Sequence, residues 1–342
     1  MLHFECDYAS GAHPQVLERL VRTNLEESSG YGEDAYCGQA ARLIQALCRA
    51  PQAQVHFLVG GTQANLTVIA AALRPHQGVI SAQSGHISDH ETGAIEATGH
   101  KVLTLAAEGG KLSARQIEAL CRDHRADPCA VHKVQPGMIY LAHPTEFGLV
   151  YSRAELEAIR AVADQYRLTV FLDGARLACG LAASDVTLPD LARLCDAFTI
   201  GGTKAGTLFG EAMVLTRDRL QEDFRYLIKQ RGGMLAKGRL LGVQFQALLE
   251  DGLYQRIGRQ EVDQAMRLQA AFQDKGWPLL YPSPTNQQFP ILPDTALEAL
   301  QRKYSVSWMG KPDAGHTAVR FCTSWSTREE DVDQLIQDIT DV

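Results

Sequence analysis

The stretch DAFTIGGTKAGTLFG, residues 196–210, decides how the rest of the chain is interpreted. Residues 197–200 have the β-branched and aromatic bias of a short strand, and Gly201-Gly202 ends it because glycine permits backbone angles that other residues avoid. Lys204 follows on a strand-end loop, where we expect it to face a cleft. A lysine with few charged neighbours can lose its proton on desolvation and act as an amine nucleophile toward a carbonyl. The stretch alone also fits a surface lysine on a glycine turn.

Two nucleotide-binding motifs do not match this loop. Residues 201–206, GGTKAG, lack the spacing of the phosphate loop G-x-x-x-x-G-K-S/T, and the dinucleotide fingerprint G-x-G-x-x-G does not occur there. Nucleotide binding is therefore disfavoured.

The composition is that of an ordinary globular protein. Its 342 residues, 45% of them hydrophobic, allow one large domain and a smaller one. The net charge of −7 and the lack of a basic cluster disfavour a nucleic-acid partner. No apolar run reaches the roughly eighteen residues of a membrane span, so we expect no membrane partner. The 8 cysteines form no C-x-x-C pair and no signal peptide is evident, so we expect reduced thiols in a cytoplasmic protein.

Strands alternate with helices along the first two thirds of the chain. Short apolar runs typical of buried strands occupy residues 55–59, 79–82, 102–105, 138–141, 168–172 and 197–200. Two of the intervening helices open with capping boxes, Ser113-x-x-Gln116 and Ser152-x-x-Glu155. This alternation indicates an α/β fold with a mostly parallel sheet, whose ligands bind beyond the carboxyl ends of the strands. Long helical patterns and then proline-rich turns place the boundary of a smaller domain near Asp251.

Polar residues follow several of these predicted strands. Gly61 and Thr62 sit on a glycine turn that opens a helix, and such a turn can cradle a phosphate. His86 and His90 stand four residues apart, but the order is not H-E-x-x-H and no third ligand is evident. We therefore expect no metal site here, and we assign His86 to stacking on a ring or relaying a proton.

A carboxylate and two guanidinium groups complete the set. Asp173 and Arg176 follow the strand at 168–172, and Arg320 stands out from the apolar strand at 318–322. Lys204 comes 31 residues after Asp173, which fits two successive strands joined by a crossover. These are the parts that pyridoxal phosphate needs: an amine for its aldehyde, an acid for its pyridine nitrogen, and arginines that grip a substrate carboxylate in bidentate fashion.

With these motifs the chain resembles the low-specificity L-threonine aldolases, which have the aspartate-aminotransferase-like fold of pyridoxal phosphate enzymes. The matching segments are 11–14 (GAHP), 31–34 (YGED), 61–65 (GTQAN), His86 with Glu91, 173–176 (DGAR), 201–204 (GGTK) and 319–321 (VRF). The resemblance implies a large cofactor-binding domain with a mostly parallel mixed sheet flanked by helices and a smaller C-terminal α+β domain. We place an N-terminal arm at residues 1–12, the large domain at 13–250 and the small domain at 251–342.

The resemblance also implies a role for each residue. Lys204 holds the cofactor as an imine, Asp173 faces its pyridine nitrogen, His86 stacks on its ring, Gly61 and Thr62 bind its phosphate, and Arg176 lies beside it. Arg176 and Arg320 bind the substrate carboxylate, and Cys6, Tyr31 and Glu91 complete the substrate contacts. Cys6 stands where family members usually have serine.

The partners and the reaction are implied in the same way. Such enzymes are homodimers or homotetramers, in which Tyr31 and a basic residue after position 228, for which Lys237 is our choice, reach a neighbour's site. The reaction is cleavage of L-threonine, L-allo-threonine or related β-hydroxy-α-amino acids to glycine and an aldehyde, with His86 or a bound water as the base. Many members have a second active-site histidine where this chain has residues 143–146, HPTE. A β-eliminating lyase and a catalytically silent cofactor-binding protein remain alternatives.

Overall fold

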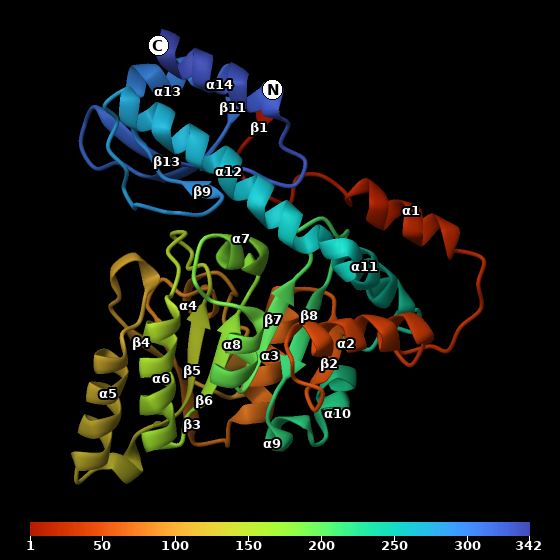
Figure 1. The fold of residues 1–342 in the computed structure, drawn as a ribbon. Helices are drawn as coiled ribbons and strands as arrows, with labels where there is room; N and C mark the ends of the chain where they lie inside the picture. Colours follow the sequence, from red (N-terminus) through yellow and green to blue (C-terminus); the bar gives the residue numbers. More distant parts are fainter.

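A seven-stranded sheet organises the larger part of the molecule in the computed structural model, which describes residues 1–342 (Figure 1). Its strands lie in the order β2 (Gln54–Leu58), β8 (Glu211–Leu215), β7 (Ala197–Gly201), β6 (Thr169–Asp173), β5 (Gln135–Ala142), β3 (Gln77–Ala82) and β4 (Val102–Leu105). The strands β2, β8 and β7 pair antiparallel, and all other neighbours pair in parallel. The sheet is therefore mixed and mostly parallel, which confirms the predicted α/β class.

Helices cover both faces of this sheet. They are α1 (Pro14–Arg22), α2 (Ala35–Leu47), α3 (Gly61–Ala72), α4 (His86–Asp89), α5 (Ala114–Ala126), α6 (Arg153–Tyr166), α7 (Leu177–Ala182), α8 (Leu188–Leu194), α9 (Asp218–Gln221), α10 (Phe224–Gln230) and α11 (Arg239–Leu249). The capping boxes at Ser113 and Ser152 form as predicted, with each serine accepting a backbone N–H three residues on. A third capping box, which starts at Thr187, opens α8.

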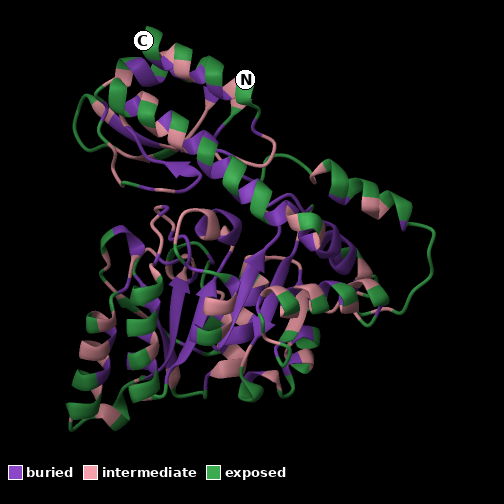
Figure 2. Cartoon of the chain, viewed as in Figure 1, coloured by how far each residue is buried: buried purple, intermediate pink, exposed green.

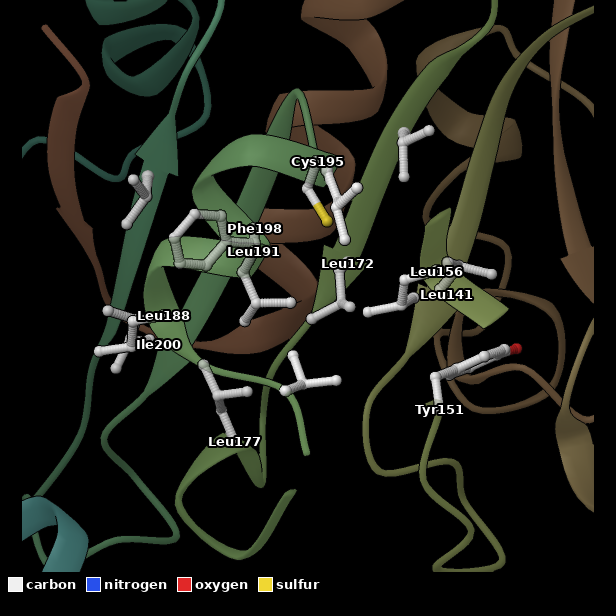
Figure 3. Packing of buried hydrophobic residues seen from close by; sticks show 14 of the residues in the cluster. Leu141, Tyr151, Leu156, Leu172, Leu177, Leu188, Leu191, Cys195, Phe198 and Ile200 are labelled. Carbon is white, nitrogen blue, oxygen red and sulfur yellow. The ribbon is translucent and has the colours of Figure 1, made fainter. Parts of the chain in front are cut away.

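The central strands β3, β5, β6, β7 and β8 are buried on both faces because alternate side chains enter different cores. The edge strands β2 and β4 are only partly buried, so the expectation of a buried strand at residues 55–59 is wrong. In β6, Leu172 belongs to the larger core cluster and Phe171 to the second one, across the sheet. Figure 3 shows Leu172 with Phe198 and Ile200 of β7 among the leucines of α7 and α8. These contacts fix the two strands whose ends carry Asp173 and Lys204. The cavity left by Leu172→Ala would lower the free energy of unfolding by about 2–5 kcal/mol. Figure 2 shows the sheet as the most continuously buried part of the fold.

The C-terminal part is a separate α+β layer. It contains α12 (Leu253–Asp274), β9 (Gln287–Gln288), β10 (Ile291–Pro293), α13 (Asp294–Leu300), β11 (Tyr304–Ser305), β12 (Ser307–Gly310), β13 (His316–Cys322) and α14 (Glu329–Asp341). Strand β13 pairs antiparallel with β9, β10 and β12. The predicted α+β character of this region is thereby confirmed. None of the helices combines the length and apolar character that a membrane span requires.

The start of the chain belongs spatially to this layer. Strand β1 (Leu2–His3) pairs in parallel with β11, and Phe4 is buried in the C-terminal core. Both termini accordingly lie on the same part of the molecule (Figure 1). We keep the division into residues 1–12, 13–250 and 251–342 as a proposal. Its support is that α12 begins at Leu253 and that the third core cluster lies in the C-terminal layer.

Candidate active site

A cavity of about 240 Å³ lies where the parallel strands end. The carboxyl ends of β5 and β7 point toward the C-terminal layer (Figure 1), and residues from five loops line the space. The predicted residues that line it are Gly61, Thr62, His86, Asp173, Arg176 and Lys204. Asp173 ends β6, Lys204 follows β7, and these two strands are parallel neighbours. The sheet topology therefore brings the predicted acid and amine into one cavity.

The amine of Lys204 lies in a desolvated position with no ion pair. Burial lowers its pKa from the ordinary value, and the nearby positive charge of Arg176 lowers it further. The ring centre of Tyr8 lies 6.0 Å from Nζ of Lys204. This environment favours the neutral amine, which is the nucleophilic form.

A second buried group, Glu211, faces the same cavity from the start of β8. Its Oε1 accepts a hydrogen bond from the Thr203 hydroxyl at 3.2 Å, and its Oε2 has no hydrogen-bond partner. Burial and the charge of Asp173 raise the pKa of Glu211 to about 8. The sequence analysis missed this residue. In the sequence, a single glutamate before an apolar run is typical of an exposed strand end, so the pattern gives no sign that Glu211 is buried.

Hydrogen bonds hold Asp173 in one orientation. Its Oδ2 accepts from the Tyr140 hydroxyl at 2.7 Å and from the Asn65 side chain at 3.0 Å. Its Oδ1 accepts from the backbone N–H of Ala175 at 3.0 Å. These three donors hold the carboxylate in position, and a carboxylate that faces a pyridine nitrogen can keep a proton on it.

His86 begins the short helix α4, and Glu91 lies behind it. The Nδ1 of His86 is 2.8 Å from Oε1 of Glu91, whose side chain is fully buried and also accepts from Asn65 at 2.8 Å. This hydrogen bond raises the pKa of His86. We predicted Glu91 as a substrate contact from the sequence. Its carboxylate in fact faces Asn65 and His86.

The turn at Gly60-Gly61-Thr62 opens α3 with free donors. The first helical bond is from Ala64 N–H to Gly60 O, and the N–H groups of Gly61, Thr62 and Gln63 donate to no protein acceptor. A Cβ added at Gly60 or Gly61 would meet nothing within 4 Å, so the backbone faces open space. A helix N-terminus of this kind attracts a phosphate.

The two predicted arginines differ in what they bind. Arg176 donates from Nε and Nη2 to the two oxygens of Asp7, at 2.6 and 3.1 Å. Although burial opposes ionisation of Asp7, the charge of Arg176 lowers its pKa to about 2. Arg320 donates only to neutral oxygens, including Glu5 O at 2.9 Å, and its Nε is buried without a partner. Cys6 lies between Glu5 and Asp7, so it connects the two arginine environments, but it does not line the cavity.

Tyr31 lies outside this cavity. It lines a separate cavity of about 220 Å³ between α2, β2, α10 and α11, and it is half exposed. The cation above its ring is Lys229, with Nζ 4.7 Å from the ring centre. Lys237, which we selected from the sequence, is exposed. The basic residue packed on Tyr31 in this chain is therefore Lys229.

These residues fit pyridoxal phosphate. The free N–H groups of α3 suit its phosphate, the oriented Asp173 suits its pyridine nitrogen, and the desolvated Lys204 suits its aldehyde. The three sites border one cavity, as a single rigid ring carrying these groups requires.

Comparisons with known proteins identify the family of the chain. The model of the beta-eliminating lyase family matches residues 4–294. The low specificity L-threonine aldolase of Pseudomonas sp. (strain NCIMB 10558) is 32% identical over 341 residues, which cover 98% of this chain and 96% of the relative. That of Pseudomonas aeruginosa is 32% identical over 342 residues, with the same coverage. The solved threonine aldolase of Leishmania major superposes with a TM-score of 0.97, 43% identity, and coverage of 100% of this chain and 99% of that chain.

The chain thus belongs to the family of beta-eliminating lyases and low-specificity L-threonine aldolases. The resemblance stated from the sequence motifs is confirmed, and so is the fold class that it implied.

Proposed function

We propose that the chain is a pyridoxal-phosphate-dependent carbon–carbon lyase that cleaves L-threonine, L-allo-threonine or related β-hydroxy-α-amino acids to glycine and an aldehyde. One observation carries the proposal: Lys204 and Asp173 line one cavity from adjacent parallel strands, beside the free N–H groups of α3. The two Pseudomonas relatives and the Leishmania structure are named threonine aldolases, which supports this reaction over β-elimination. The retained, desolvated Lys204 argues against a silent cofactor-binding protein.

The cofactor-binding roles follow from the contacts. Lys204 supplies the amine that attaches to the aldehyde, and Asp173 keeps a proton on the pyridine nitrogen. Gly61 and Thr62 donate backbone N–H groups to the phosphate, and His86 lies against the ring. Bound pyridoxal phosphate supplies an electron sink for the pair released when a bond to the substrate Cα breaks.

Arg320 is the less engaged of the two arginines and so the freer to bind a substrate carboxylate, although Arg176, and not Arg320, lines the cavity. The present acceptors of Arg320 are neutral, so a carboxylate would gain charge-assisted bonds in replacing them. Arg176 already has a carboxylate partner in Asp7. To the substrate carboxylate it contributes its remaining donor, Nη1, and its positive charge. Cys6, on the segment between them, offers only a weak thiol donor. Glu91 acts on the substrate through His86, which it orients.

The test is product analysis with purified protein loaded with pyridoxal phosphate. We expect glycine and acetaldehyde in equal amounts from L-threonine and L-allo-threonine, and no pyruvate from L-serine. Pyruvate and ammonia from serine or cysteine, without glycine from threonine, would instead identify a β-eliminating lyase. Cofactor binding without turnover of any of these amino acids would identify a silent binding protein.

We also propose a homodimer or homotetramer that shares its active sites. Tyr31 and Lys229 form an exposed pair outside their own chain's cavity, where they could serve a neighbour. Leu17 and Val21 of α1 and Leu25 beyond it are 49%, 68% and 93% exposed, which is typical of a surface that a second copy covers. Light scattering at micromolar concentration should give twice or four times the chain mass of 37.5 kDa. A monomer would contradict the proposal.

Finally, we propose a cytoplasmic location. All 8 cysteines are free, and most are buried, which suits a reducing compartment. A thiol titration of the denatured protein, prepared without reductant from its native cells, should find 8 thiols.

A further inference from the structure

Glu146 is a carboxylate of the cavity that the roles above leave unused. It lies in the loop between β5 and α6, and it lines the cavity together with His86 and Lys204. Its Oε1 accepts the backbone N–H of His86 at 2.8 Å, and its Oε2 is buried with no hydrogen-bond partner. A buried oxygen without a partner costs free energy, so a position that keeps one is a candidate for binding a ligand.

The other acidic residues of the cavity are engaged by side chains. Asp173 accepts from Tyr140 and Asn65, and Glu211 accepts from Thr203. Glu146 bonds no side chain at all, since its one partner is a main-chain N–H. Glu146 and Glu211 therefore each have one oxygen without a partner, and their positions decide which of them can serve a substrate hydroxyl.

His86 is the less suitable base. Its Nδ1 is bonded to the buried Glu91 carboxylate, and this bond favours the protonated ring, which has no lone pair to accept a proton. Lys204 is assigned to the cofactor aldehyde and Asp173 to the pyridine nitrogen. Glu211 lies on the lysine side of the cavity, seven residues from Lys204 and bonded to Thr203 next to it. Glu146 alone combines an unused carboxylate with a position beside His86.

We propose that Glu146 is the catalytic base that removes the proton from the β-hydroxyl of the substrate. This inference rests on the proposed aldolase function. In the step, the hydroxyl O–H bond breaks and its proton passes to the Glu146 carboxylate. The electron pair of the broken O–H bond forms the second C–O bond of the aldehyde. At the same time the Cα–Cβ bond breaks and leaves its electron pair on Cα. Cα later gains one proton from solvent and Glu146 returns one, so glycine and the aldehyde leave without net proton change.

The surroundings of Glu146 support this role. Burial raises its pKa to about 7, and the negative charge of Asp173 adds to the rise. The charged and titratable groups around Glu146 are Asp173 from β6, His86 from α4, Tyr140 from β5, and Tyr151. The charge of Glu146 helps to raise the pKa of Tyr151. A base is most effective when its pKa lies near the working pH.

The test compares the wild type with Glu146→Gln, both loaded with pyridoxal phosphate. Glutamine keeps an oxygen for the His86 N–H but cannot take a proton, so the fold and the cavity should persist. We expect glycine release from L-threonine to fall about 10²–10⁴-fold, the range for loss of a general base. The wild-type rate of glycine release should rise with pH through about 7. The variant should lack this rising limb of the pH–rate profile.

A second readout separates the proposed role from a structural one. Glycine has no β-hydroxyl, so Glu146→Gln should bind it with a Kd within about threefold of wild type, measured from the absorbance of the bound cofactor. The exchange of its Cα protons in D₂O, followed by NMR, should persist as well. Glu211→Gln is the matched control, because it makes the same chemical change on the lysine side and should keep the pH limb near 7.

Three results would count against the proposal. Wild-type cleavage by Glu146→Gln would show that the base is another group. Parallel loss of glycine binding, glycine exchange and cleavage would show that Glu146 maintains the site and does not act on the hydroxyl. Loss of the pH limb in Glu211→Gln with its retention in Glu146→Gln would move the role to Glu211. If the wild type itself releases no glycine from threonine, the proposed function fails before this test applies.

Discussion

The cavity has two walls that contain the same kinds of groups in different settings. The lysine wall, Thr203, Lys204 and Glu211, comes from the β7–β8 connection and the start of β8. The histidine wall, His86 and Glu146, comes from α4 and the loop after β5, and Glu91 lies behind His86. Lys204 has no ion pair, and burial and the charge of Arg176 lower its pKa. His86 has a buried carboxylate partner in Glu91, and its pKa is raised. Burial beside a positive charge and pairing with a carboxylate thus shift the pKa values of the two nitrogens in opposite directions.

The comparison teaches that residue type does not fix a group's role in this site. Burial shifts the pKa of Lys204 toward the neutral amine, whereas the bond to Glu91 shifts the pKa of His86 toward the protonated ring. In both walls the carboxylate at the cavity surface, Glu211 or Glu146, is partly protonated near neutral pH, because burial raises its pKa to about 8 or about 7. Four changes test this contrast, and the first should have the largest effect.

Lys204→Ala removes the nitrogen of the lysine wall. We expect turnover of threonine to fall by roughly 10³-fold or more, as for the loss of a covalent nucleophile. The cofactor should also leave the variant on dialysis, which its visible absorbance measures. His86→Phe is the control on the other wall, because it keeps a flat ring and should retain the cofactor. Equal cofactor loss in both variants would break the contrast between the walls.

Asp7→Asn leaves Arg176 buried beside Lys204 without its carboxylate. Breaking one partner of a buried pair typically costs about 3–5 kcal/mol, and urea unfolding of the cofactor-free protein should show a loss of that size. Asp7 also raises the pKa of Lys204, so the variant amine should titrate at lower pH than in the wild type. Glu5→Gln, two residues away in the half-exposed pair with His3, should cost less than about 1 kcal/mol. Similar losses of the free energy of unfolding in both variants would show that the buried Asp7–Arg176 pair stabilises the fold no more than the half-exposed pair does.

Glu91→Gln tests the histidine wall directly. Loss of the carboxylate should lower the pKa of His86, because the hydrogen bond to Glu91 is the main cause of its rise. NMR titration of the His86 ring measures this change. A charge-assisted bond of about 1.5–3 kcal/mol implies a loss of threonine cleavage of about 10–100-fold. An unchanged His86 titration would mean that the histidine wall does not depend on this pair.

Glu211→Gln should have the smallest effect, on the pH dependence of stability. The folded-state pKa of Glu211 is raised to about 8 from the ordinary 4.5, so the native state keeps a proton that the unfolded chain has released. Its contribution to stability is therefore present at low pH and is lost as pH rises toward 8. Between pH 6.5 and 8.5 the wild type should lose on the order of 1–2 kcal/mol more than the variant. Thermal unfolding of the two cofactor-free proteins across this pH range checks the predicted difference. Curves of stability against pH that run parallel for the wild type and the variant would contradict it.

The main features of the site could be predicted because they are local in sequence. Glycines and polar residues mark the ends of the buried strands β6 and β7, and parallel pairing brings those ends to one edge. Asp173 and Lys204 were found in this way. Arg320 was found because it interrupts the apolar strand at residues 318–322, and the family resemblance then implied its role.

What the sequence did not reveal depends on contacts between distant residues. Asp7 meets Arg176 and Asn65 meets Glu91 only in the folded chain, so neither pair leaves a pattern of spacing. Glu211 was missed because burial at a strand end cannot be told from exposure by periodicity. Lys237, our choice for a basic residue that reaches a neighbour's site, stays a prediction, and the structure places Lys229 of α10 on the ring of Tyr31.

The pairing of β1 with β11 has a consequence for how the protein is made. Leu2 and His3 bond to a strand about three hundred residues later, and Asp7 also accepts from Asn286 at 3.0 Å. During synthesis the first residues must wait, unpaired, until Tyr304 and Ser305 have left the ribosome. The Asp7–Arg176 side of the cavity is therefore completed only after the C-terminal layer has been made.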